Sequence, residues 1–253
     1  RIIESARRFA QDYLKSLPDF FCVQFTRRLN NPKADGTFAP ADRFQEILSF
    51  VDGKENYQSL QLAWPPPPDD GSRGSGVSSR GEWGGLMGAI FDQDAAAKFT
   101  WKSTGTIAGE QVHVFDYEVD AAHSQFSLTW GGKWKGKWYP KSKPSYRGSV
   151  FLAAETLRIR RLTLAAKVAP GAFPIEETTH EVDYDLQQLG GTEYLLPKHA
   201  VMQARIGKKK LTRNEIDFRD LANWNNIGAP YTIYPGQTLR LYPASGKPVA
   251  SGA

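Results

Sequence analysis

Lysines and aromatic residues alternate in the segment WGGKWKGKWYPKSKPSY, residues 130–146, and no Asp or Glu occurs between residues 121 and 154. Aromatic rings beside cations suit three anionic partners: single-stranded nucleic acid, the headgroup zone of a membrane, and an envelope polymer. Nucleic acid ranks lowest because the charge is confined to one loop. The alternative is a solvated hairpin loop whose aromatic stems pack beneath it. The residues expected to form the anionic-surface loop are Lys133, Trp134, Lys135, Lys137, Trp138 and Lys141.

Three carboxylates follow one another at every second position of the segment HEVDYD. Strand periodicity places Glu181, Asp183 and Asp185 on one face. Such a row could bind calcium or supply an acid/base pair. The simpler alternative is a solvated face, which we favour because half-buried antiparallel strands alternate in this way. Together with His113, these are the groups that an enzyme of unknown reaction would use in a cleft.

The remaining residues that could carry chemistry form no known catalytic or metal-binding pattern. The four histidines have no metal-binding helical spacing, and the chain has no cysteine cluster and no nucleotide-binding loop. The single cysteine, Cys22, lies in an apolar strand-like run, which favours a buried structural thiol. We therefore expect no catalytic residue, no metal and no cofactor, and a binding protein rather than an enzyme.

Composition describes an ordered globular chain. Of the 253 residues, 40% are hydrophobic and 23% charged, and the net charge is +5. The chain contains no run of about 18 apolar residues, so the sequence predicts no membrane-spanning helix. The chain begins with Arg1 and shows no charged-then-apolar leader, so we expect a processed or trimmed product. These features permit an exported, periplasmic or extracellular protein.

Periodicity predicts one helix followed by many strands. Apolar residues recur at helical spacing between residues 3 and 17, and Pro18 ends the pattern. Residues 64–83 are rich in Pro, Gly and Ser and predict a flexible loop, and residues 84–91 a short helix. The strands are expected in FFCVQFTRR, on both sides of Asp52-Gly53, and in EQVHVFDYEVD, QFSLTW, GSVFLAA, LRIRRLTLAAKV, HEVDYDLQQL, TEYLLP and HAVMQARIG.

Short turns between successive strands indicate an antiparallel meander. In LRIRRLTLAAKV the apolar parity changes between Ile159 and Leu162, which a β-bulge near Arg160-Arg161 would repair. The predicted fold class is mainly β (α+β): an N-terminal helix followed by a long, bent antiparallel sheet.

Several motifs carry a resemblance over roughly residues 1–220. The runs YLKSLPDFFCVQFTRR, RGEWGGLMGAIF, YRGSVFLAAETLRIRRLTL and TRNEIDFRD resemble a group of uncharacterised exported bacterial proteins. The layout of that group is similar to the LolA-type lipoprotein carriers. The resemblance implies a domain over residues 1–216 that holds a hydrophobic or lipid-like ligand between a concave sheet and the helix, gated by the loop and the short helix.

The tail has a different character. The stretch LANWNNIGAPYTIYPGQTLRL, residues 221–241, resembles the second half of a LysM domain of murein hydrolase activators. This implies a partial LysM-like segment over residues 217–242, in which Asp217 caps a helix through Asn223, and a flexible tail over residues 243–253. It also implies contact with N-acetylglucosamine-containing peptidoglycan through Asn226, Ile227, Gly228, Ala229, Pro230, Tyr231 and Thr232.

Two alternatives stay open for these regions. NEIDFRDL also fits the last strand of the β domain, in which case the LysM match is incidental or marks a fusion. For the whole chain, the alternative to a ligand-binding protein is a purely structural interaction module with exposed aromatic residues on a flat face.

Overall fold

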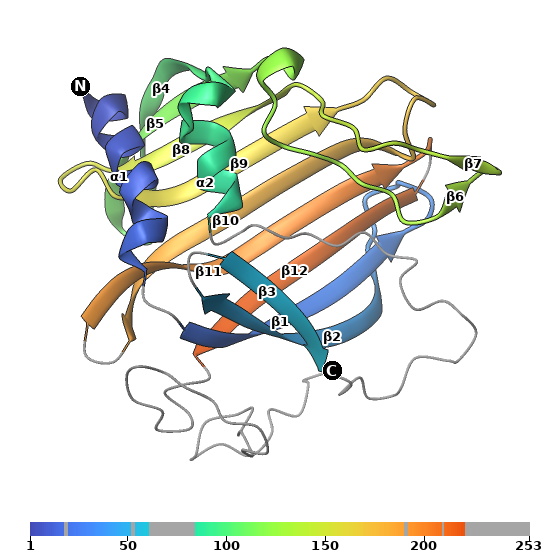
Figure 1. The fold of residues 1–253 in the computed structure, drawn as a ribbon, viewed down its shortest axis with the longest axis horizontal. Coiled ribbons are helices and arrows are strands. Elements are labelled where there is room, and N and C mark those ends of the chain that lie inside the picture. Colours follow the sequence, from blue (N-terminus) through green and yellow to red (C-terminus); the bar gives the residue numbers. More distant parts are fainter. Residues whose placement is uncertain (18–19, 52–53, 61–83, 190–191, 209, 221–253) are drawn as a thin grey trace.

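One large antiparallel sheet dominates the molecule (Figure 1). The computed structural model describes residues 1–17, 20–51, 54–60, 84–189, 192–208 and 210–220. In these residues ten strands pair in the order β3-β2-β1-β12-β11-β10-β9-β8-β5-β4, and β6 and β7 form a separate hairpin. The two edge strands, β3 and β4, do not pair with each other, so the sheet is open.

The elements have the following bounds. The helices are α1 (Ile2–Ser16) and α2 (Gly85–Phe91). The strands are β1 (Phe20–Asn31), β2 (Ala39–Val51), β3 (Lys54–Leu60), β4 (Lys98–Ile107), β5 (Glu110–Val119), β6 (Lys133–Trp134), β7 (Lys137–Trp138), β8 (Tyr146–Ala153), β9 (Ile159–Lys167), β10 (Ile175–Leu189), β11 (Thr192–Ile206) and β12 (Lys210–Asp220).

Helix α1 lies directly on the sheet. Its buried residues Ala6, Ala10 and Tyr13 recur at helical spacing and form one apolar stripe. The ring of Tyr13 meets that of Tyr184, on β10, edge to face, with the centroids 6.5 Å apart. The helix ends at Leu17, whose extended backbone is the conformation that a following proline favours. The predicted helix and its end are confirmed.

Helix α2 covers the same face of the sheet and contacts α1 (Figure 1). It is short, and its five apolar side chains are all buried: Leu86, Met87, Ala89, Ile90 and Phe91. We call the side of the sheet under α1 and α2 the helix-covered face, and the opposite side the outer face. Neither helix in the described part of the chain has the length and hydropathy that a membrane crossing requires.

The meander is confirmed from β8 to β12, where each strand pairs with the next along the chain. The β-bulge is confirmed as well: Phe151 is opposite Arg161 and Leu152 is opposite Ile159, which leaves Arg160 as the extra residue. The N-terminal strands join this meander by a long-range pair, because β1 lies beside β12 over Cys22–Asn31.

The strand predictions are corrected in three places: one predicted strand is absent, two predicted strands form one, and one strand was not predicted. QFSLTW forms no strand, and only a single bridge connects Leu128 with Ser142. TEYLLP and HAVMQARIG form one strand, β11, in which a bulge at Lys198 shifts the register between Pro197 and His199. Strand β4 was not expected, because its largely exposed side chains give little apolar alternation. The loop at 64–83 and the turn Asp52-Gly53 lie outside the described residues.

Candidate functional site

The lysine and aromatic segment forms a two-stranded hairpin. Lys133 is opposite Trp138, and Trp134 is opposite Lys137. Residues that are directly opposite share a face of a β-ladder. The hairpin therefore has an inner face with Trp134 and Lys137, and a solvent face with Lys133 and Trp138.

The inner face is held against the rest of the molecule. The indole of Trp134 meets that of Trp130 edge to face, with centroids 5.4 Å apart, and lies next to Gly207 at the end of β11. Below the hairpin, Tyr139 contacts Phe173, which belongs to a second apolar cluster. The aromatic stems are therefore packed beneath the loop, as one of the two sequence interpretations expected.

The solvent face remains open. The side chain of Trp138 is 69% exposed, more than that of any other large hydrophobic residue in the described part of the chain. Lys133, Lys135 and Lys141 are also exposed, and so is Lys137, although it is opposite Trp134 on the inner face. Packed stems thus carry a cationic tip with one exposed indole, and binding of an anionic surface by this tip stays a prediction.

The three carboxylates of β10 lie on the outer face and are matched by cations. Because Arg160 is bulged, it and Arg161 both reach β10. Arg161 forms a bidentate pair with Asp183 and also approaches Glu181, with N and O 3.2 Å apart. Arg160 pairs with Asp185 at 2.9 Å. These pairs make the row a charge-compensated outer face, in agreement with the solvated-face interpretation.

Hydrogen bonds across this row shift the pKa values of two groups, Arg161 and Asp185. The hydrogen bond to Asp183 raises the pKa of Arg161 above its usual value. Burial raises the pKa of Asp185, but hydrogen bonds from Arg160 and Lys198 outweigh it and leave that pKa below the usual value. Both groups therefore stay ionised at neutral pH. His113, the other residue of the enzyme hypothesis, lies on β5, and strands β8 and β9 separate it from β10.

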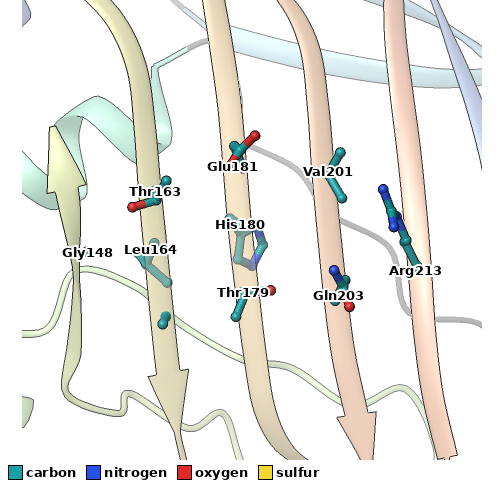
Figure 2. Close-up of a pocket in the computed structure, with 10 residues that line it drawn as sticks. Gly148, Thr163, Leu164, Thr179, His180, Glu181, Val201, Gln203 and Arg213 are labelled. Carbon is teal, nitrogen blue, oxygen red and sulfur yellow. The ribbon is translucent and has the colours of Figure 1, made fainter. Parts of the chain in front are cut away.

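A pocket of about 310 Å³ lies on the outer face (Figure 2). Side chains of four neighbouring strands line it: Thr163 on β9, Thr179 and Glu181 on β10, Val201 and Gln203 on β11, and Arg213 on β12. Gly148 and Ala165 leave room beside them. Of these residues, sequence reasoning had singled out Glu181 and missed the others. Alternation puts each of them on one face of its strand, but only the register places them side by side.

The region of the LysM resemblance begins inside the sheet. Strand β12 is paired on both sides, with β1 and β11, up to Asp217, and its pairing with β1 continues to Asp220. Asp217 is therefore a strand residue, and the predicted helix cap at this position is wrong. Pairing on both edges outcompetes the local capping preference, as the alternative interpretation of NEIDFRD expected. Residues 226–232 lie outside the described residues.

A histidine fixes Asp217 on the outer face. The Nδ1 atom of His199 lies 2.8 Å from Oδ1 of Asp217, and the two residues are directly opposite each other on β11 and β12. The hydrogen bond with Asp217 raises the pKa of His199 above its usual value. The end of β12, which is the last described part of the chain, is thus joined to the rest of the sheet by side chains as well as by backbone pairing.

Comparison with known proteins gives a local match and a distant one. Residues 211–241 match the LysM domain. Over 36 residues, or 14% of this chain, the sequence is 58% identical to the murein hydrolase activator NlpD of Escherichia coli strain K12. The matched part is 10% of the activator, so the chain spans about a tenth of the length of this relative.

Two solved structures are similar to this chain at low sequence identity. A LolA superfamily protein from Nitrosomonas europaea is 12% identical with a TM-score of 0.33, and the match covers 86% of this chain and 91% of that one. A DUF1329 family protein from Desulfovibrio piger is 9% identical with a TM-score of 0.37, over the same shares. The LysM resemblance expected from the sequence is therefore found over residues 211–241, and a LolA superfamily protein is among the structures similar to this chain.

Proposed function

We propose that this chain is a non-enzymatic binding protein of the bacterial cell envelope, exported to the periplasm or the cell surface, that contacts peptidoglycan through its LysM-like segment. The observation that supports this most is the 58% identity over 36 residues with an activator of murein hydrolases. Murein is peptidoglycan, and the match falls on the LysM domain. Asn226 to Thr232 are the residues proposed to touch the glycan.

The geometry of β12 supports a working role for so short a segment. A piece of about 30 residues is smaller than the roughly 40 that usually fold without further support. Here its first ten residues, 211–220, belong to β12, in which residues 211–217 have partners on both edges and residues 218–220 pair with β1. The segment that follows residue 220 therefore continues from a strand that the sheet holds in place, and this supports the proposal that so short a segment can work.

Binding to purified peptidoglycan tests this proposal. We expect the full chain to sediment with peptidoglycan, and both the double variant Asn226→Ala, Tyr231→Ala and a chain ending at Asp220 to lose at least about tenfold in affinity, the loss of two central contacts. The shortened chain keeps all of β12, so its thermal unfolding controls for the fold. Equal sedimentation of all three proteins would contradict the proposal.

A hydrophobic or lipid-like ligand on the helix-covered face is the second part of the proposed function. Helix α2 supports it: a helix of seven residues is too short to be stable alone, yet its five apolar side chains cover the sheet. Moving this helix would open an apolar surface of the kind that such a ligand needs.

Extraction of the purified protein with organic solvent checks this part. We expect a lipid to be recovered by mass spectrometry, and we expect Ile90→Glu to reduce its amount severalfold, because Ile90 is fully buried under α2 and a carboxylate there disfavours an apolar neighbour. Gly85→Ala, at a helix position with open space around it, is the matched control. An extract without lipid, from protein purified without detergent, would contradict it.

A further inference from the structure

We propose that the β6–β7 hairpin docks this protein on an anionic phospholipid membrane. The docking surface consists of Lys133, Lys135, Lys137, Lys141 and Trp138. This inference is independent of the peptidoglycan proposal, because it depends on residues in another part of the fold.

The solvent face of the hairpin combines the two groups that a membrane interface favours. Trp138 and Lys133 are directly opposite each other, so their Cβ atoms are about 5 Å apart. An indole prefers the headgroup zone, where its apolar body is shielded from water and its N–H stays solvated. A neighbouring lysine can meet a lipid phosphate while the indole inserts between headgroups.

The turn presents a third lysine in a conformation that lysine rarely adopts. Lys135 and Gly136 have φ angles of 49° and 78°, which is the pattern of a type I′ turn. Asn or Asp usually occupies the first of these positions, because other side chains meet steric strain there. A strained lysine at an exposed tip is a feature that folding alone does not require.

These charges are available to a partner. Within the described residues, the lysines that form ion pairs are Lys98, Lys102, Lys167 and Lys198, none of which belongs to the hairpin. No Asp or Glu occurs from residue 121 to residue 154. The hairpin therefore keeps its full positive charge and has no carboxylate along the chain to repel an anionic surface.

The hairpin lies at the opposite end of β12 from Asp220. Trp134 lies next to Gly207, close to the start of β12, whereas residue 221 follows the other end of that strand. An eleven-residue strand is about 35 Å long at about 3.3 Å per residue. Figure 1 shows the hairpin projecting from one side of the molecule, away from α1 and α2.

A membrane explains the exposed indole better than a soluble polyanion does. A polyanion needs only the lysines, since phosphate contacts are made by cations. The ring of Trp138, 69% exposed on a rigid hairpin, reaches its preferred surroundings only where an apolar layer begins.

Vesicle binding by the full chain tests the inference. The probes are vesicles of phosphatidylcholine with phosphatidylglycerol, and vesicles of phosphatidylcholine alone. We expect binding to the anionic vesicles that weakens as salt is added. Each lysine at an anionic surface contributes about fivefold, so Lys133→Ala, Lys135→Ala and Lys137→Ala together should weaken binding about 100-fold. Trp138→Ala should weaken it about tenfold and should abolish the quenching of fluorescence by brominated lipids.

A matched triple variant gives the control. Lys15→Ala, Lys98→Ala and Lys102→Ala remove the same charge from α1 and β4, so binding should change by less than about threefold. Thermal unfolding confirms that each variant folds. An equal loss in both triple variants would mean that net charge alone drives binding, and would overturn the proposal. Absence of vesicle binding, or hairpin-dependent sedimentation with lipid-free peptidoglycan instead of vesicles, would also overturn it. The variant Asn226→Ala, Tyr231→Ala should bind vesicles normally, which separates this result from the peptidoglycan test.

Discussion

Replacing Gly148 by alanine is expected to lower the free energy of unfolding by about 3 kcal/mol, the upper end of the usual cost of overpacking. A Cβ atom at Gly148 would overlap the carbonyl oxygen of Thr163 and lie 2.7 Å from its carbonyl carbon. It would also lie 3.0 Å from Cε1 of Tyr117. Backbone atoms cannot move aside without separating β8 from β9.

A substitution at Gly148 has this effect because the ring of Tyr117 lies across β8 at this position, from β5 to β9. Tyr117, directly opposite on β5, is buried, and its hydroxyl donates a hydrogen bond of 2.8 Å to the carbonyl of Thr163 on β9. The missing side chain of Gly148 leaves the space through which that ring reaches β9. Alanine would therefore remove a buried hydrogen bond in addition to forcing the strands apart.

Thermal unfolding checks this prediction. For a chain of this size, about 3 kcal/mol corresponds to a fall of roughly 6–12 °C in the melting temperature. Gly105→Ala is the matched control, since its Cβ would meet Val112 at 3.6 Å, an ordinary contact, on another strand of the same sheet. Tyr117→Phe should lower stability by about 1 kcal/mol by removing the hydroxyl alone. Unchanged melting of Gly148→Ala would show that β8 and β9 are farther apart than described.

Acidification is expected to cost up to about 3 kcal/mol of stability through His180 alone. Its ring meets that of Phe126 edge to face, with centroids 5.3 Å apart, and in register it lies between Leu164 and Met202. Burial among these side chains lowers the pKa of His180 to about 4. The neutral imidazole is held by a 3.2 Å contact between Nε2 and the hydroxyl of Thr178.

The sign of the effect follows from the two pKa values. The unfolded chain takes up the proton near pH 6.5, whereas the folded chain does so only near pH 4. Stability from this group is complete above pH 6.5 and is lost as the pH falls toward 4. His199 acts in the opposite direction, because its pKa is raised by Asp217 and its contribution is present at low pH and lost as the pH rises.

Urea unfolding at pH 7 and pH 4 separates His180 from all other groups. Wild type should lose up to about 3 kcal/mol more than His180→Gln between the two pH values, because glutamine keeps a polar side chain but does not titrate. Carboxylates and His199 titrate in both proteins and cancel in the difference. Equal losses in the two proteins would show that the imidazole of His180 is solvated.

Local patterns in the sequence determined the elements and some of their details. The spacing of Ala6, Ala10 and Tyr13 gave the helix, because burial on one side repeats every three to four residues. The parity change in LRIRRLTLAAKV gave the bulge at Arg160, because a strand that keeps one face buried must insert a residue when its pattern slips. The cationic and aromatic character of the β6–β7 hairpin could also be predicted from the sequence, because its two strands are neighbours along the chain.

Tertiary structure alone decided which segments meet. The pairing of β1 with β12 joins residues almost 200 positions apart, and no local pattern records a partner at that distance. For the same reason the sequence left Asp217 open between a helix cap and a strand, and pairing on both edges of β12 made it a strand residue. The pocket on the outer face also depends on register, because it arises where side chains of β9, β10, β11 and β12 are brought together. The need for glycine at position 148 depends on register as well, because Tyr117 of β5 and the backbone of β9 meet at that point of β8.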